Sequence, residues 1–177
     1  MAFDLYFFQI FRSLAEKNWV IDALSVFFAK YVIFILVFAA IFLGWRMKDW
    51  RHKFYFFALS LASLFVSRGV IFEILNYAFR RERPADYLDF EPVIRGSGFS
   101  FPSGHATFLF TLAFCVWIFN KKWGSIFIAL SFLVGISRII VGAHWPTDVI
   151  FGAIIASFIP FLLKPLFFKE KENPRLN

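Results

Sequence analysis

The chain has 177 residues, of which 60% are hydrophobic and 23% aromatic, and it carries a net charge of +7. A soluble domain is roughly 45–50% apolar, so this composition excludes an ordinary soluble protein and indicates membrane spans. Most basic residues flank apolar runs, which favours membrane orientation over nucleic-acid binding, and the single cysteine, Cys115, excludes an intrachain disulfide.

Residues 1–17 are expected to form an amphipathic helix that lies in the membrane interface. The apolar side chains of one face recur at helical spacing: Phe3, Phe7, Ile10, Phe11 and Leu14. Charged residues take the other face: Asp4, Arg12, Glu16 and Lys17. The alternative is a frayed terminus. The segment has no basic region before a short apolar core, so no cleavable signal peptide is predicted.

Five apolar segments follow, each able to cross about 30 Å of hydrocarbon, although the third is only just long enough. In chain order they are 19–44, 54–79, 103–120, 123–142 and 147–168. The predicted fold is all-α, an integral membrane helical bundle of five transmembrane helices plus the interfacial helix, in one domain. Lys30, Arg68 and Glu73 lie inside the first two spans, and their depth is compatible with a structural Lys30–Glu73 ion pair.

The connections between the spans predict the orientation. Basic residues cluster in the segment 45–53, at Lys121 and Lys122, and in the tail 169–177, which the positive-inside rule places in the cytoplasm. Residues 80–102 then lie outside, although they carry four arginines against that rule. A loop of this length is usually functional or disordered, and its aromatic residues argue against disorder. We therefore expect 80–102 to be an active-site loop.

Because successive spans cross the membrane in opposite directions, several polar residues at the span ends fall on this outer side. They are Arg83, Ser103, Gly104, His105, Arg138, His144 and Asp148. An arginine guanidinium matches two phosphate oxygens, and a helix that begins with Ser-Gly offers free N–H groups to an anion. The set lacks the carboxylate cluster that would hold Mg²⁺ or Ca²⁺. It predicts a site for a phosphate ester that works without a metal or other cofactor.

The same residues suggest roles. Asp148 can accept a hydrogen bond from one ring nitrogen of His144 and leave the other nitrogen free as a nucleophile on phosphorus. His105 can protonate the leaving oxygen and then activate water, while Arg83, Arg138 and the helix N-terminus stabilise the phosphoryl oxygens. Taken singly, each has a structural alternative: Asp148 and Ser103 as helix caps, and the arginines as interface anchors.

Pro102-Ser103-Gly104-His105 and Ser137-Arg138-x5-His144-x3-Asp148 resemble the second and third signatures of the type 2 phosphatidic acid phosphatase (PAP2) superfamily. The resemblance implies a metal-independent phosphatase with a phosphohistidine on His144 and acid–base chemistry by His105. The first signature, Lys-x6-Arg-Pro, departs from the family because Asn76 stands at the lysine position before Arg83-Pro84. Arg80 or Arg81 is expected to supply the missing cation, and Arg80 would lie one turn before Arg83 if the helix continued.

The chain also looks like small bacterial undecaprenyl pyrophosphate phosphatases, which implies the bacterial inner membrane and an outward-facing site. The expected partners are a lipid phosphate or pyrophosphate substrate and membrane lipids, with no nucleic acid and no obligate protein partner. Phosphatidylglycerophosphate, phosphatidic acid and lipid A phosphatases share the motifs and stay open as alternatives. So does a non-catalytic headgroup binder, because Asn76 breaks one signature.

Overall fold

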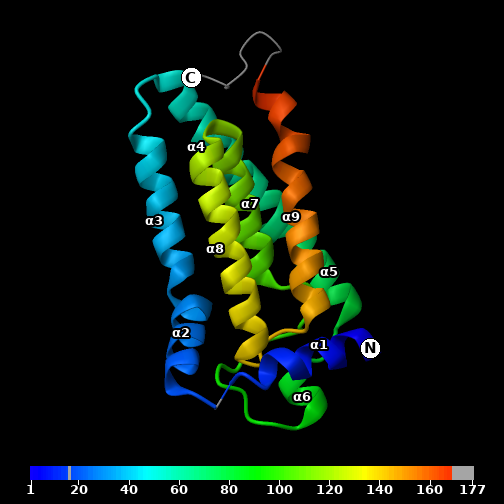
Figure 1. The fold of residues 1–177 in the computed structure, drawn as a ribbon. Helices are drawn as coiled ribbons and strands as arrows, with labels where there is room; N and C mark the ends of the chain where they lie inside the picture. The colour runs from blue at the N-terminus through cyan, green and yellow to red at the C-terminus, as the bar shows by residue number, and fades with distance from the viewer. Residues whose placement is uncertain (16, 169–177) are drawn as a thin grey trace.

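The computed structural model describes residues 1–15 and 17–168, and in this part of the chain the fold is all-helical, without a β-strand (Figure 1). In chain order the helices are α1 (Ala2–Arg12), α2 (Trp19–Lys30), α3 (Val32–Trp45), α4 (Trp50–Leu64), η1 (Phe65–Ile71), α5 (Phe72–Phe79), α6 (Pro84–Leu88), α7 (Gly104–Phe119), α8 (Lys121–Ile140) and α9 (Pro146–Phe167). The segment η1 is a π-helix that joins α4 to α5 without a break. The all-α prediction is confirmed within these residues, and the predicted cytoplasmic tail 169–177 lies outside them.

Helix α7 is the centre of the bundle. It packs against α3, α4, α8 and α9, and most of its side chains are buried. The largest core cluster joins α7 residues such as Leu109 and Val116 to Leu36, Phe56 and Phe127 of the surrounding helices. Because its neighbours enclose it, α7 presents little surface to its surroundings.

The predicted count of five spans is not confirmed. Within the described residues, three helical segments are long and apolar enough to cross a membrane, namely residues 50–88, α8 and α9. A fourth results if α2 and α3, which meet at a 46° bend, count as one span. Helix α7 has only 16 residues, or about 24 Å at 1.5 Å per residue, which is short of the hydrocarbon thickness.

The two ends of the bundle differ in charge. Figure 1 shows α1, α6 and the α8–α9 link at one end, and the α3–α4 and α7–α8 connections at the other. The basic residues of the segment 45–53, together with Lys121 and Lys122, belong to the second end. The polar residues predicted to share one face are therefore gathered at the end opposite these basic connections.

Helix α1 lies across the end of the bundle that carries the α8–α9 link. The prediction that Asp4 lies on its solvated polar face is wrong. Phe3, Phe7 and Ile10 are exposed, as an interfacial helix requires, but Asp4 is only 4% exposed. It is buried with Phe8, whose ring packs on Trp145 with the centroids 5.3 Å apart. Because the helix docks on the α8–α9 link, the face with Asp4 meets protein instead of water.

Candidate active site

His144 lies in the link between α8 and α9, where its ring is buried. Its Nδ1 is 2.9 Å from the carbonyl oxygen of Ser100, which belongs to the loop before α7. A carbonyl oxygen can only accept, so Nδ1 carries the proton and Nε2 keeps its lone pair. Nε2 lies 3.4 Å from Nη1 of Arg83. The Nε2 lone pair of His144 thus faces a guanidinium, which donates only a long hydrogen bond to it, as suits a nucleophile beside a bound phosphate.

Asp148 is fully buried near the start of α9 and is held by several groups, although not as expected. Its Oδ2 accepts hydrogen bonds from the backbone N–H of Trp145 at 2.9 Å and from the Ser100 hydroxyl. The distance from this oxygen to Nδ1 of His144 is 3.8 Å. The expected direct hydrogen bond between His144 and Asp148 is therefore wrong. Ser100 lies between the two side chains instead: its carbonyl accepts from Nδ1 of His144, and its hydroxyl donates to Asp148. Asp148 still lies close enough to stabilise a positive charge on the ring.

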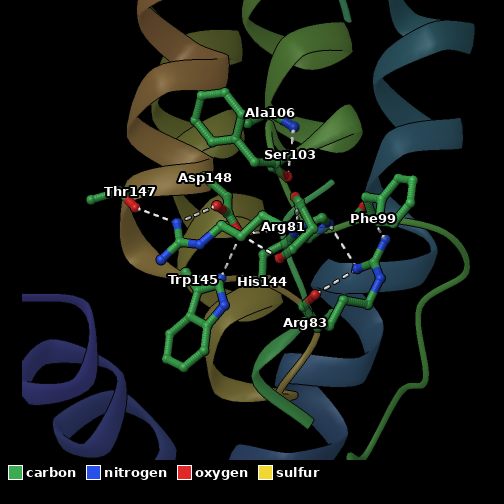
Figure 2. Close-up of polar contacts among 12 residues, drawn as sticks. Arg81, Arg83, Phe99, Ser103, Ala106, His144, Trp145, Thr147 and Asp148 are labelled. Atoms are coloured by element: carbon green, nitrogen blue, oxygen red, sulfur yellow. Dashed lines mark hydrogen bonds and ion pairs between the residues drawn. The ribbon is translucent and has the colours of Figure 1, made fainter. Parts of the chain in front are cut away.

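Arg83 is buried and its guanidinium is fixed by backbone carbonyls. Nε donates to Gly98, Nη1 to Ala143, and Nη2 to Ser97 and Phe99, over 2.6–3.2 Å. Three of these four carbonyls belong to the loop 80–102, so one side chain ties that loop to the α8–α9 link. Figure 2 shows the guanidinium of Arg83 beside Phe99, with His144 between it and Arg81.

The start of α7 supplies the next part of the site. Ser103 is the N-cap, and its hydroxyl accepts a long hydrogen bond of 3.5 Å from the backbone N–H of Ala106. Gly104 and His105 follow in the first turn. The His105 ring lies within electrostatic range of His144 and of the arginines at 83 and 138. The structure therefore brings both predicted histidines to the positive end of a helix, where an anion is favoured.

Arg138, near the end of α8, is a buried cation whose hydrogen bonding is incomplete. Its side chain is 7% exposed, and within the described residues its Nε has no hydrogen-bond partner. The backbone carbonyl of Arg138 accepts from the N–H groups of Ala143 and His144, which holds the histidine close to it. A buried guanidinium N–H without an acceptor is costly, and a phosphate oxygen is an acceptor that would satisfy it.

Arg80 does not join this group, which corrects the expectation that it supplies the missing cation. Helix α5 ends at Phe79, and Arg80 adopts a left-handed conformation with φ of 44°. This turn directs its side chain back to its own helix, where Nε donates to the Tyr77 carbonyl and the guanidinium stacks on the Tyr77 ring.

Arg81 enters the site instead and connects it to α1. Its Nη1 donates to Oδ1 of Asp148 and to the Thr147 hydroxyl, both at 2.7 Å, and its Nη2 pairs with Asp4 at 2.6 Å (Figure 2 shows the Asp148 and Thr147 contacts). Asp4 in turn accepts from the backbone N–H and the hydroxyl of Thr147. Sequence reasoning missed Asp4, because its partners are 77 and 143 residues away. The excess of arginines on the outer side was the available signal for Arg81.

Asn76 and the charged residues of the second span have definite partners. The Asn76 amide donates to the carbonyls of Phe99 and Phe101, so it anchors the loop before α7. Glu73 pairs with Arg68 at 2.8 Å and not with Lys30. The expected Lys30–Glu73 pair is wrong, because Arg68 lies on the same continuous helix as Glu73, five residues before it.

Burial sets the protonation of His144. It lowers the pKa of the ring from 6.5 to about 4, and the nearby Asp148 only partly offsets this effect. The imidazole is therefore neutral at physiological pH, which is the nucleophilic form. Within the described residues, no group of three or more His, Cys, Asp and Glu could hold a metal ion.

The chain is similar to known phosphatases over much of its length. The chain matches the PAP2 superfamily over residues 54–172. It is 32% identical to an undecaprenyl-diphosphatase of Sulfolobus acidocaldarius, over 80% of this chain and 68% of that protein. A lipid A 4'-phosphatase of Bacteroides thetaiotaomicron is 44% identical over a shorter stretch, 46% of this chain and 36% of that protein. The crystal structure of Aquifex aeolicus LpxE superposes with a TM-score of 0.71 at 26% identity, covering 92% of this chain and 94% of that one.

Proposed function

Because the chain belongs to the PAP2 superfamily and is a phosphatase of membrane lipids, we propose that its substrate is undecaprenyl pyrophosphate, hydrolysed to undecaprenyl phosphate and inorganic phosphate. The relative from Sulfolobus acidocaldarius supports this choice, since it carries that activity in its name and aligns over most of both chains.

The observation that carries the proposal is the buried and unpartnered Nε of Arg138, whose guanidinium lies within electrostatic range of His144. The orphaned guanidinium N–H and the start of α7 offer hydrogen-bond donors to an anion, and the fixed guanidinium of Arg83 adds a positive charge beside them. A nucleophilic nitrogen adjoins the same space. Binding alone would need the donors but not the nucleophile, so this arrangement favours phosphoryl transfer.

In the proposed first step, the Nε2 lone pair of His144 attacks the terminal phosphorus. The bond from phosphorus to the bridging oxygen breaks, and His105 protonates that oxygen as undecaprenyl phosphate leaves. The negative substrate offsets the charge of the surrounding arginines, so that His105 can hold the proton that it donates. Asp148, 3.8 Å from Nδ1, stabilises the positive ring of the phosphohistidine.

In the second step, His105 accepts a proton from water and the water oxygen attacks the phosphorus. The nitrogen–phosphorus bond breaks, which releases inorganic phosphate and returns His144 to its neutral form. Arg83 and Arg138 stabilise the charge on the phosphoryl oxygens in both steps. The Ser100 carbonyl keeps the proton on Nδ1, so the nucleophilic nitrogen is ready for the next substrate.

We also propose the membrane arrangement that this substrate needs. Helices α2 and α3 together form one bent span, α7 is an enclosed span, and residues 50–79, α8 and α9 complete five in one phosphatase domain. The basic connections lie in the cytoplasm of a bacterial inner membrane, and the site with its 80–102 loop lies on the outer side. Helix α1 lies in the outer interface with Phe3, Phe7 and Ile10 toward lipid.

A second candidate is a lipid A phosphatase. The match to the Bacteroides thetaiotaomicron lipid A 4'-phosphatase favours it, because that stretch has the higher identity. The two candidates use the same catalytic groups and differ in the bond that breaks, a phosphoanhydride in one and a phosphate ester of a sugar in the other.

The test is phosphate release by purified protein in detergent with EDTA present. Undecaprenyl pyrophosphate, lipid A, phosphatidic acid and phosphatidylglycerophosphate would be compared at equal surface concentration, with His144→Ala as control. We expect EDTA-resistant release that His144→Ala abolishes, fastest on undecaprenyl pyrophosphate. Faster release from lipid A would favour the second candidate, and no release by folded protein would indicate a headgroup binder.

A further inference from the structure

We propose that Arg68 is a second phosphate-binding cation of this site, which holds the phosphate group of a diphosphate substrate that is not attacked. The inference rests on the proposed function, because it concerns the same substrate and deepens its specificity. It assigns the intramembrane Arg68–Glu73 pair a role in distinguishing diphosphates from monophosphates.

The position of Arg68 is next to the proposed catalytic groups. A methyl group added at Gly104 would lie 3.3 Å from Nε of Arg68 and 3.2 Å from the ring of Phe72. The guanidinium therefore lies against the first turn of α7, and it is within electrostatic range of His105. Arg68 belongs to the π-helix η1, and π-helical turns inside α-helices are frequent at functional sites.

The surroundings of Arg68 are unfavourable for a purely structural ion pair. Its side chain is 37% exposed and that of Glu73 is 60% exposed. The continuous helix formed by α4, η1 and α5 also exposes Phe65, Val70 and Ile74. Stacking on Phe72, with 3.7 Å from the guanidinium carbon to the ring centroid, orients the side chain but satisfies none of its N–H donors. Charged groups on an apolar membrane face are costly, and they are usually retained for a function.

The other arginines of this end are already engaged. Arg83 donates to four carbonyls, and Arg81 lies between the carboxylates of Asp4 and Asp148. Arg80 is stacked on Tyr77. A diphosphate carries more negative charge than a monophosphate, so it needs a cation beyond Arg83 and Arg138, which serve the attacked phosphate in the proposed mechanism. Arg68 can provide it, because its carboxylate partner is exposed and can be replaced by a phosphate oxygen.

The Asn76 substitution supports the same assignment. The Asn76 amide gives both of its N–H groups to the carbonyls of Phe99 and Phe101 and brings no charge to the site. Arg68 lies eight residues before Asn76 on the continuous helix of η1 and α5, which is about 12 Å along the helix axis. It approaches the start of α7 from the membrane side. We infer that the lipid-linked phosphate occupies this side, while the terminal phosphate lies at His144.

The experiment compares Arg68→Gln with Arg80→Gln, the same change at an exposed arginine of the same end. For each, kcat/KM would be measured on undecaprenyl pyrophosphate and on phosphatidic acid, with inhibition constants for inorganic pyrophosphate and phosphate. A charge-assisted hydrogen bond is lost only on the diphosphate, so we expect its kcat/KM to fall about 10- to 100-fold more than that of phosphatidic acid. Inhibition by pyrophosphate should weaken in parallel, and Arg80→Gln should keep the wild-type ratios.

A further variant, Glu73→Gln, separates binding from folding. It breaks the resting ion pair but keeps the cation, so KM for the diphosphate should stay or fall. Equal losses on both substrates in Arg68→Gln, or a Glu73→Gln variant as impaired as Arg68→Gln, would overturn the inference in an enzyme that remains active. Failure of the proposed function is distinct, because it would appear as no phosphate release from any lipid by the wild-type protein.

Discussion

Gly96 gives a sharp test of the role of Arg83. A Cβ atom at this position would lie 2.3 Å from Nη1 of Arg83, 2.5 Å from Cζ and 2.8 Å from Nε. Ordinary contact begins at 3.4 Å, so Gly96→Ala must move the guanidinium by the difference, about 1.1 Å. The hydrogen bonds that fix this group are 2.6–3.2 Å long, and a shift of this size breaks them.

Gly96→Ala is expected to lower activity strongly while the protein stays folded. A displacement of about 1 Å near a reacting group can cost about 100-fold in rate, which corresponds to about 2.7 kcal/mol. The displaced atoms are the end of one side chain, so the free energy of unfolding should fall by only about 1–3 kcal/mol. The assay is kcat/KM for EDTA-resistant phosphate release, with thermal unfolding in detergent measured on the same preparation.

Gly69→Ala is the matched control. The nearest atom to its added methyl is a ring carbon of Phe65 at 3.5 Å, which is ordinary contact, so its kcat/KM should stay within about threefold of wild type. Gly96→Ala with wild-type kcat/KM would refute the reasoning, because it would show that catalysis does not depend on the position of the Arg83 guanidinium.

The remaining predictions concern His144 and its neighbours. Asp148→Asn should lower kcat about 10²- to 10⁴-fold with little loss of folded protein, and wild-type turnover would reduce Asp148 to a helix cap. Asp4→Asn removes one of the two carboxylates on Arg81 and should lower kcat about tenfold in steady-state assays, whereas an effect on stability alone would make α1 only a docking element. Burial lowers the pKa of His144 to about 4, so kcat/KM should lose activity in acid near pH 4, and a limb near pH 6.5 would contradict the buried neutral ring. Since the unfolded chain binds this proton from about pH 6.5 downward and the native chain does not, the free energy of unfolding should decrease between pH 6.5 and 4.

Helix α1 illustrates where periodicity succeeds and where it fails. The spacing of Phe3, Phe7 and Ile10 predicted a helix with an exposed apolar face, and the structure has both. The same periodicity assigned Asp4 to a polar, solvated face. Periodicity distinguishes apolar from polar positions, but it cannot tell a side chain that meets water from one that meets a buried arginine.

The amino-acid sequence by itself determined the class of the protein and most of its candidate site. Apolar runs, basic connections and the residues His105, Arg138, His144 and Asp148 are local features, because hydropathy, charge and spacing act over a few residues along the chain. They were sufficient to predict an all-helical bundle and a phosphate site at one end of it.

Only the tertiary structure decided which groups hold the site in place. Three features appear only once the helices are packed: the Ser100 carbonyl on His144, the bridge from Asp4 through Arg81 to Asp148, and the position of Arg68 beside Gly104. The first two join residues between 44 and 77 positions apart. Local sequence cannot specify such contacts, because a hydrogen bond depends on distances of a few tenths of an ångström that the packing of the whole bundle sets.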